Sequence, residues 1–524
     1  MKILIISAEV APFAKVGGLA DVAGALPKAL KRMGHDVRVA MPCYRMIETN
    51  PAFAVRDVLA PFPVRIRTGV AQDAFVRGAA IQAGSDAVPV YLIGNRGEGG
   101  RPGYFEEATD STKVYTVSPE PYVFFCHAVL ETIKRLEGGW TPDVLHCNDW
   151  HSGLVPVFAR TSYADDPAVS PAASVFTIHN LAYQGGFDRS EWAATGLPDR
   201  LFHPSALEFY GGWSFMKGGL TFSDRVNTVS ETYAGEIQTA EYGCGLEGLT
   251  QTLCRTERLS GILNGIDYEE YDPATDRRIA RQFSGESPEG KAVCKAALQA
   301  ELGLKVSPRT PLVGLVSRLA DQKGLDLIRA SVEEMLALPV QLALLGTGDR
   351  AYEAYFCCLQ ERYPGRVHAR IAFDVELAQR IYAGSDLFLM PSRFEPCGLG
   401  QMMALRYGTV PIVRATGGLA DSIVDVAAGS GDKGNGFVFT DYSAAALLDT
   451  VKRAAGLYRR EAAWTALVRH AMHCDFSWSR SAAQYEALYA AAVTARRLQR
   501  PIALERGAPA FSPTVLKDAA GPKD

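Results

Sequence analysis

Residues 2–30, KILIISAEVAPFAKVGGLADVAGALPKAL, contain the pattern from which the fold follows. An apolar, β-branched run at Ile3–Ile6 is followed by a loop with Gly17 and Gly18, and then by a segment typical of a helix. The string GGLAD of this loop recurs at Gly417–Asp421, again between a strand-like run and a helix-like segment. The repetition at equivalent positions indicates that both halves of the chain share a strand–loop–helix design.

Short apolar runs alternate with longer amphipathic segments through most of the chain. Strands are predicted in the first half at Ile3–Ile6, Val37–Ala40, Val90–Ile93, Val144–His146, Ser174–Ile178 and Val226–Val229. In the second half they are predicted at Leu312–Val316, Gln341–Leu345, Leu387–Met390, Val410–Val413 and Phe437–Phe439. The intervening segments Leu325–Leu336 and Val375–Ala383 have helical periodicity. This alternation predicts an α/β fold with two doubly wound domains, each a parallel sheet wrapped by helices.

The length of 524 residues exceeds what one hydrophobic core usually holds, which predicts two sizeable domains. We place the first domain at residues 1–264, because a polar segment typical of a surface linker follows this point. The second domain is placed at residues 265–477, and a closing helix at residues 478–498. Residues 499–524 are rich in Pro, Ala, Gly and charge, which predicts a mobile tail.

Composition argues against several classes of protein. A net charge of −4 and a pI near 6.2 do not indicate a nucleic-acid binder. No apolar stretch approaches the roughly 20 residues of a membrane span, and the first residues lack a signal-peptide pattern, so we expect a cytoplasmic protein. The 10 cysteines are scattered without zinc spacing, so neither a metal site nor a structural disulfide is expected.

Polar residues of unusual type follow the predicted strands. In open parallel sheets, ligands bind beyond the carboxyl ends of the strands. The residues at such positions are Glu9, Lys15, Gly17, Gly18, Asp149, His179, Arg318, Lys323, Glu395, Gly417 and Gly418. Two sets of loops, one from each domain, are expected to face each other across a cleft, because several such groups seldom converge without a function.

Arg318 and Lys323 flank a turn directly after a buried strand, where two cations can neutralise a diphosphate leaving group. The alternative is an ordinary pair of basic surface residues. Glu395 can accept hydrogen bonds from sugar hydroxyls or stabilise developing positive charge, and its alternative is an ion pair with Arg393.

The glycine loop at Gly17 and Gly18 can offer backbone N–H groups to a phosphate, or can be a plain tight turn. It does not match the dinucleotide fingerprint GxGxxG. The second strand also ends in Ala40-Met41-Pro42, without the acidic residue that binds a ribose. Both observations argue against a dehydrogenase.

Eight motifs resemble those of glycogen and starch synthases, in the expected order and over nearly the whole chain to about Leu498. They are KVGGLADV at 15–22, HCNDWHSGL at 146–154, FTIHNLAYQG at 176–185, LNGID at 263–267, VSRLADQKGLDL at 316–327, PSRFEPCGLGQM at 391–402, RATGGLADS at 414–422 and DFSWSRSAAQYEALY at 475–489. The resemblance implies the GT-B architecture, in which two Rossmann-like domains face a deep cleft and a C-terminal helix returns to the first domain. It also implies an ADP-glucose donor, an α-1,4-glucan acceptor and no cofactor or metal.

Roles for single residues are implied by the same resemblance. Asp149 and His179 are implied near the donor glucose, Arg318 and Lys323 as the diphosphate clamp, and Glu395 on the glucose ring. Further donor contacts are implied for Lys15, Gly17, Gly18, Asn264, Phe373, Cys397, Gly398, Leu399, Gly417 and Gly418. Acceptor or cleft positions are implied for Glu9, Asp21 and Tyr104. The implied reaction is retaining transfer, with ADP leaving from the face that the acceptor hydroxyl attacks.

The chain departs from the family pattern at a few positions. The Gly-Tyr pair common after the strand near residue 371 reads Ala372-Phe373, and the Thr common after EPCGL is Gly400. Phe373 retains an aromatic face for the adenine, although core packing is the alternative for an aromatic residue after a strand. Two other functions stay open: a GT-B enzyme with another nucleotide sugar or acceptor, such as UDP-glucose or a maltosyl donor, and a catalytically weak glucan-binding homologue.

Overall fold

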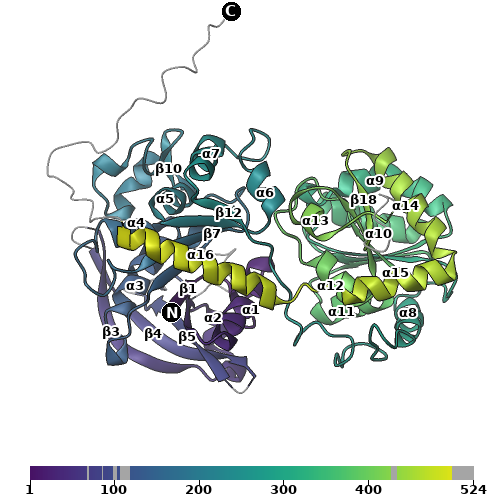
Figure 1. Ribbon diagram of the computed structural model, residues 1–524, viewed down its shortest axis with the longest axis horizontal. Helices are drawn as coiled ribbons and strands as arrows, with labels where there is room; N and C mark the ends of the chain where they lie inside the picture. Colours follow the sequence, from purple (N-terminus) through teal and green to yellow (C-terminus); the bar gives the residue numbers. More distant parts are fainter. Residues whose placement is uncertain (68–69, 85, 98–102, 107–117, 427–433, 499–524) are drawn as a thin grey trace, which may run out of the picture.

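The computed structural model describes residues 1–67, 70–84, 86–97, 103–106, 118–426 and 434–498 (Figure 1). Two lobes lie side by side, and each is built on its own sheet. Nine of the strands between residues 2 and 261 form one sheet, and three short strands between residues 186 and 214 form a small separate one. Strands between residues 312 and 439 form a six-stranded sheet. The predicted mobile tail at 499–524 lies outside the described residues.

The first sheet is parallel over seven of its strands and continues into an antiparallel edge. In sheet order the strands are β12 (Leu259–Gly261), β11 (Arg225–Thr228), β7 (Ala173–Ile178), β6 (Val144–Asn148), β1 (Lys2–Ile6), β2 (Asp36–Pro42), β5 (Asp86–Asn95), β4 (Val70–Ala83) and β3 (Arg56–Arg67). Pairing is parallel from β12 to β5 and antiparallel from β5 through β4 to β3. Each strand predicted for this half overlaps an observed one.

The antiparallel pair β3–β4 was not predicted. Pro61 and Pro63 interrupt the apolar pattern of β3, and a strand with prolines reads as an edge strand or a loop. The structure places β3 at the sheet edge, where its register against β4 also shifts at several points. Proline is tolerated there because one side of an edge strand makes no ladder hydrogen bonds.

The first strand and helix show why the sequence folds locally as it does. In β1, four of five side chains are buried, as expected for a central parallel strand covered on both faces. Helix α1 (Gly18–Arg32) begins directly after the glycine loop. Its last turn contains Lys31 and Arg32, whose charges complement the negative end of the helix dipole.

The long helix α16 (Trp478–Leu498) returns from the second half and packs on the first, as Figure 1 shows. Its Tyr485 and Tyr489 are fully buried in the core of the first half. The Tyr489 hydroxyl lies 2.9 Å from Nδ1 of His146 in β6, and the Tyr485 hydroxyl accepts a hydrogen bond of 3.2 Å from Asn227 in β11. Helix α16 therefore packs in the core of the first half.

The second sheet is parallel throughout. Its strands in order are β15 (Val367–Ile371), β14 (Gln341–Gly346), β13 (Leu312–Val316), β16 (Leu387–Met390), β17 (Val410–Arg414) and β18 (Phe437–Phe439). Helices that cover it include α8 (Gly290–Glu301), α9 (Leu325–Ala337), α10 (Arg350–Arg362), α11 (Val375–Gly384), α12 (Gly400–Arg406), α14 (Ala444–Tyr458) and α15 (Glu461–His473). Each predicted strand of this half overlaps one of these strands.

The chain passes between the halves twice, and the two passages lie together. Ile266 forms a parallel bridge with Ser477, and its N–H donates to the carbonyl of Phe476 at 2.8 Å. The domain boundary at residue 264 remains a prediction, which lies between the end of β12 and the start of β13. None of the helices in the described ranges is long and apolar enough to span a bilayer.

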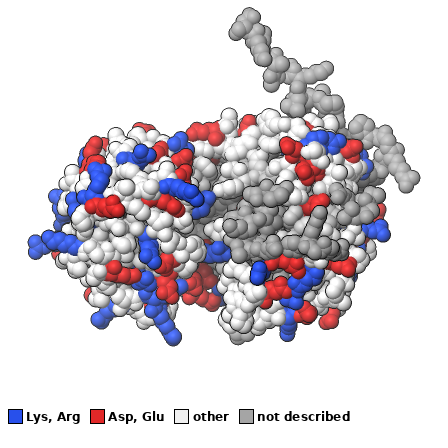
Figure 2. Space-filling view, turned by 180° about the vertical axis from the view of Figure 1, so that it is seen from behind, with Lys and Arg blue, Asp and Glu red and all other residues white. Residues whose placement is uncertain are grey.

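Charges of both signs are mixed over the surface that Figure 2 shows. Lys and Arg side chains alternate there with Asp and Glu side chains on both lobes. Nucleic-acid binders instead concentrate basic residues on one face. The surface therefore agrees with the slightly negative total charge.

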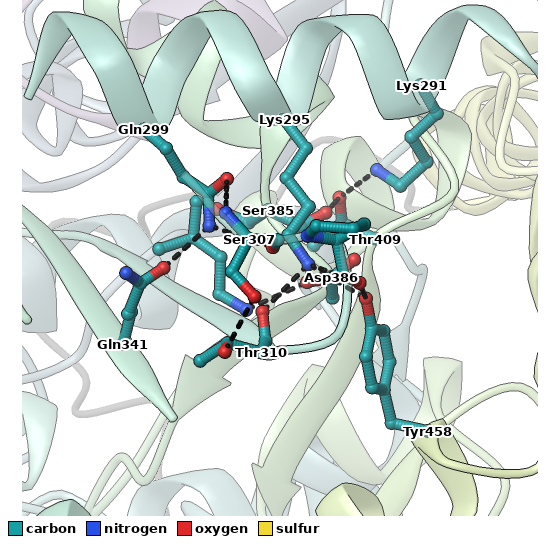
Figure 3. Close-up of polar contacts among 12 residues, drawn as sticks. Lys291, Lys295, Gln299, Ser307, Thr310, Gln341, Ser385, Asp386, Thr409 and Tyr458 are labelled. Atoms are coloured by element: carbon teal, nitrogen blue, oxygen red, sulfur yellow. Dashed lines mark hydrogen bonds and ion pairs between the residues drawn. The ribbon is translucent and has the colours of Figure 1, made fainter. Parts of the chain in front are cut away.

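A buried polar cluster lies at the amino ends of the second sheet's strands, away from the strand ends that point to the predicted site. Figure 3 shows Lys291 and Lys295 of α8 directed into it. Nζ of Lys295 lies 2.6 Å from Oδ2 of Asp386 and donates to the Tyr458 hydroxyl at 2.8 Å. The same Asp386 oxygen accepts the N–H of Leu312, the first residue of β13, at 2.8 Å. The ion pair thus joins α8 to two strands of the sheet.

Breaking this ion pair is expected to destabilise the second half strongly. Asp386→Asn leaves the Lys295 ammonium buried without its counter-charge, which typically costs about 3–5 kcal/mol. We expect that loss in the free energy of unfolding measured by urea denaturation. The matched control is Asp449→Asn, in the exposed pair Lys452–Asp449, for which less than about 1 kcal/mol is expected. Equal effects of the two substitutions would contradict the stabilising role of the buried pair.

Candidate active site

Loops from the carboxyl ends of both sheets meet where the two halves face each other. A Cβ atom built on Gly18, after β1, would lie 3.3 Å from Cδ1 of Leu399, after β16. Arg318, after β13, donates a hydrogen bond of 3.0 Å to the hydroxyl of Tyr183, after β7. The loops that carry the predicted site residues therefore come into contact across the two halves, as expected for the carboxyl ends of parallel strands.

Lys323 and Glu395 form an ion pair at the centre of the second half's loops. Nζ of Lys323 lies 3.0 Å from Oε1 and 2.7 Å from Oε2 of Glu395. The Ser392 hydroxyl donates to the same Oε2 at 2.9 Å. The alternative partner, Arg393, instead forms its ion pair with Asp326 at 3.2 Å. The structure thus brings two predicted site residues together and rejects the Arg393–Glu395 pair.

Backbone contacts hold the loops of Lys323 and Glu395 against each other. Gly324 has φ +68°, and a Cβ at this position would approach the carbonyl oxygen of Pro391 to 2.0 Å. The N–H of Arg393 donates to the carbonyl of Gln322 at 2.9 Å. Only glycine fits at residue 324, because a side chain there would meet both backbone strain and a steric clash. These contacts set the short distance between the lysine and the glutamate.

Asp149 has the features of a residue under functional constraint. It has φ +53°, which is uncommon for a residue with a side chain, and it is buried directly after β6. Its Oδ1 accepts the N–H of His179 at 2.7 Å and the N–H of Asn180 at 3.4 Å. Burial raises the pKa of Asp149 to about 7, against the opposing effect of these hydrogen bonds, and the charge of Glu9 raises it further. Asp149 and the His179 loop therefore form one unit.

His179 is held as a neutral imidazole in a defined orientation. Burial lowers the pKa of His179 to about 3. Its Nε2 lies 2.9 Å from Oδ1 of Asn148, whose Nδ2 donates to the carbonyls of Ile6 (3.2 Å) and His146 (3.3 Å). Because these carbonyls orient the Asn148 amide with its oxygen toward His179, Nε2 is the nitrogen that bears the proton.

Two carboxylates of the first half bind groups of the first glycine loop. Oε2 of Glu9 accepts the N–H groups of Val16 (3.0 Å) and Gly17 (3.2 Å). Nζ of Lys15 lies 2.6 Å from Oδ1 of Asp21, and burial raises the pKa of that carboxyl. Glu9, Lys15 and Asp21 thus form one cluster at the start of α1, and the charge of Glu9 also acts on Asp149.

The second glycine loop packs on the backbone of the Glu395 loop. Gly417 has φ +45°, and the N–H of Gly418 donates to the carbonyl of Glu395 at 3.1 Å. A Cβ on either glycine would approach backbone oxygens of that loop to about 2 Å, 2.0 Å for Gly417 and 2.1 Å for Gly418. Cys397 is buried, which raises the pKa of its thiol to about 12, and Asn264 lies against it. Oδ1 of Asn264 is buried and has no hydrogen-bond partner among the described residues.

Phe373 is not part of the core, which was the alternative for this residue. Its side chain is 67% exposed, and it follows β15 just before α11, whose N-cap is Asp374. An aromatic ring this exposed at the carboxyl end of a strand is available to a ligand. Gly398 lies in the same set of loops and has φ +70°.

Tyr104 belongs to a separate polar group of the first half. Its hydroxyl accepts a hydrogen bond from Gln72 at 2.9 Å and donates to Glu120 at 3.3 Å, while its N–H donates to Asn95 at 2.8 Å. The acceptor role of Tyr104 remains a prediction.

Some residues that build the site were not singled out from the sequence. Tyr183, Ser392 and Asn148 orient Arg318, Glu395 and His179 respectively. All three lie inside the motifs FTIHNLAYQG, PSRFEPCGLGQM and HCNDWHSGL. Their presence in these motifs could have indicated a role at the site. Which site residue each of the three orients could not be predicted from the sequence.

Two family models match the chain, one in each half. Residues 2–252 match the starch synthase catalytic domain, and residues 303–465 match glycosyl transferases group 1. The chain is 49% identical to a glycogen synthase of Desulforudis audaxviator over 93% of this chain and 96% of that protein. It is 48% identical to a glycogen synthase of Moorella thermoacetica, covering 95% of this chain and 98% of the relative.

Solved structures agree with this assignment. The catalytic domain of starch synthase IV from Arabidopsis thaliana, bound to ADP and acarbose, matches with a TM-score of 0.86 and 35% identity over 94% of this chain and 99% of that one. Sucrose-phosphate synthase from Thermosynechococcus elongatus, at 17% identity and a TM-score of 0.56, shares the fold. These matches confirm the GT-B architecture and the glycosyltransferase activity that the motifs predicted. The chain belongs to the bacterial glycogen synthase family.

Proposed function

We propose that this chain transfers glucose with retention from ADP-glucose to the non-reducing end of an α-1,4-glucan and releases ADP. The observation that supports this most is the Lys323–Glu395 pair, because it presents a cation and a carboxylate together at the carboxyl end of the second sheet. A nucleotide sugar needs both: positive charge for its diphosphate, and an acceptor for the hydroxyls of its sugar.

Lys323 and Arg318 serve as the diphosphate clamp in this proposal. As the bond between glucose C1 and the phosphate oxygen breaks, negative charge accumulates on the departing ADP. Two cations beside the departing phosphates stabilise that charge more than they stabilise the ground state, which lowers the barrier. Glu395 meanwhile accepts hydrogen bonds from the glucose ring. Before the donor arrives, the ion pair keeps each partner from being buried with an uncompensated charge.

The acceptor hydroxyl attacks glucose C1 from the face that ADP leaves. One C–O bond breaks, another forms on the same side, and the hydroxyl proton passes to the departing phosphate oxygen. His179 is neutral and oriented beside Asp149, so it can hydrogen-bond to the donor sugar without repelling a positively charged sugar at the transition state. The exposed ring of Phe373 receives the adenine by stacking. The starch synthase structure with bound ADP supports the choice of nucleotide.

The donor is tested by measuring initial rates with ADP-glucose and with UDP-glucose, using glycogen as the acceptor. We expect kcat/KM for ADP-glucose to be at least about tenfold higher, the factor that corresponds to one well-placed hydrogen bond to the base. Protein with Lys323→Ala, prepared in parallel, controls for contaminating transferases. A preference for UDP-glucose would refute the proposed donor, and no transfer from either donor would indicate a catalytically weak homologue.

Removal of the Lys323 charge is expected to slow turnover. Lys323→Ala should lower kcat at least about 100-fold, as for other lost transition-state electrostatic contacts. Lys305→Ala, an exposed lysine of the same half, is the control. Activity within a few fold of the unchanged protein would show that Lys323 does not act on the diphosphate.

Phe373 is expected to contribute to ADP binding by stacking. Phe373→Ala should weaken ADP binding by about 1–3 kcal/mol, the range for a base on an aromatic ring. Phe373→Tyr should leave binding unchanged or tighten it slightly, because the added hydroxyl contributes at most about 1 kcal/mol. Calorimetry with ADP measures both, and thermal unfolding should be nearly constant because the side chain is 67% exposed. Normal ADP binding by the Ala variant would remove Phe373 from the donor site.

A further inference from the structure

Helix α6 (Glu231–Glu236) belongs to the first half and contacts two loops of the second half's predicted site. Figure 1 shows it at the boundary of the lobes, facing α13 (Gly417–Ser422). The Ser230 hydroxyl, at the N-cap of α6, accepts the N–H of Tyr233 at 3.1 Å and donates to the carbonyl of Pro396 at 2.6 Å. Ser230 and Pro396 are both buried, so this contact fixes the backbone next to Glu395 from across the interface.

The other end of α6 holds the second glycine loop. Oε1 of Glu236 accepts the hydroxyl of Thr416 at 2.8 Å and the N–H of Gly417 at 3.0 Å. Between the two ends, the N–H of Thr232 donates to Oδ2 of Asp421 at 3.0 Å. Hydrogen bonds of Ser230, Thr232 and Glu236 therefore join α6 to Pro396 and to the segment 416–421.

The same helix is tied to the catalytic loop of its own half. The Tyr233 hydroxyl accepts the N–H of Leu181 at 3.1 Å, two residues beyond His179. On the far side, the N–H of Gly418 donates to the carbonyl of Glu395. One short helix thus connects the backbone beside His179 with the backbone on which Glu395 and the second glycine loop rest.

We propose that α6 is a positioning helix of the active site, in which Glu236 and Ser230 set the place of the second glycine loop and the Glu395 loop relative to His179. The proposal rests on the proposed function for the identity of the donor. A contact made only for stability would be better served by apolar residues, since burying a carboxylate costs free energy. Glu236 bears that cost: burial raises its pKa despite the hydrogen bonds from Gly417 and Thr416, and its Oε2 is buried with no partner among the described residues.

The test compares Glu236→Leu with Glu236→Gln, whose amide oxygen can still accept both hydrogen bonds. In Glu236→Leu, hydrogen exchange of the backbone amides at 416–419 should be faster, and kcat/KM for ADP-glucose should fall about tenfold, as for a lost hydrogen bond to a charged group. KM for glycogen should stay within twofold. Glu236→Gln should keep slow exchange and activity within about threefold. Glu231→Leu, an exposed glutamate of the same helix, is the matched control and should behave as the unchanged protein.

A second variant approaches the contact from the other half. Asp421→Ala removes the acceptor of Thr232 from an exposed position, so folding should be retained. Asp421→Ala should also speed hydrogen exchange at 416–419 and lower kcat/KM for ADP-glucose, but less than Glu236→Leu does. In the double variant with Glu236→Leu, the fold-loss of kcat/KM should be smaller than the product of the two single fold-losses, because both substitutions release the same segment. Unchanged exchange, or faster exchange with kcat/KM within twofold, would refute the proposal.

Failure of the positioning role of α6 can be distinguished from failure of the proposed function. If no nucleotide sugar supports transfer by the unchanged protein, the proposed function fails, and ADP affinity then replaces kcat/KM as the measurement. Weaker ADP binding by Glu236→Leu, with faster exchange at 416–419, would still support a positioning role for α6. ADP binding equal to that of the unchanged protein would overturn it.

Discussion

A parallel sheet needs helices on both faces, and in the first half part of this cover comes from the far end of the described chain. The last helix of the described chain, α16, packs in the core of the first half. Two fully buried tyrosines on α16 enter the core of the first half, and their hydroxyls contact His146 and Asn227 on two neighbouring strands. A buried hydroxyl without a partner would be costly, so these contacts also fix where along the sheet the helix lies.

This return explains the connection between the halves. Because the chain must leave the first half and come back to it, two passages run together, joined by the bridge between Ile266 and Ser477. Lys28 of α1 also forms ion pairs with Asp267 and Glu269 beside the first passage. Most buried apolar residues of each half form a cluster of their own, although Val229 of the first half packs in the core of the second. Polar contacts such as Arg318–Tyr183 and those of α6 also join the loops of the two halves.

Several charged groups of the site are paired within the protein. Lys323 lies on Glu395, Lys15 on Asp21, and Glu9 on the N–H groups of the first glycine loop. A partly buried charge needs such a partner, because loss of water disfavours the ionised form. Each of these groups is thus held in place by a contact within the protein.

The sequence by itself determined the α/β class, the central strands of both sheets and the family. These features depend on local information: continuous apolar runs, helical periodicity, and motifs with specific spacing. The edge pair β3–β4 was not predicted, because prolines interrupt the apolar pattern of β3. An edge strand tolerates them, since its side chains and backbone are only partly constrained by the core. Tertiary structure alone decided the partners of the site residues. Glu395 binds Lys323 rather than its near neighbour Arg393, Phe373 is exposed rather than in the core, and Glu236 reaches Gly417. Such pairs join loops far apart in the chain, and the distance between those loops is set by the packing of whole sheets and helices, which no local pattern of residues encodes.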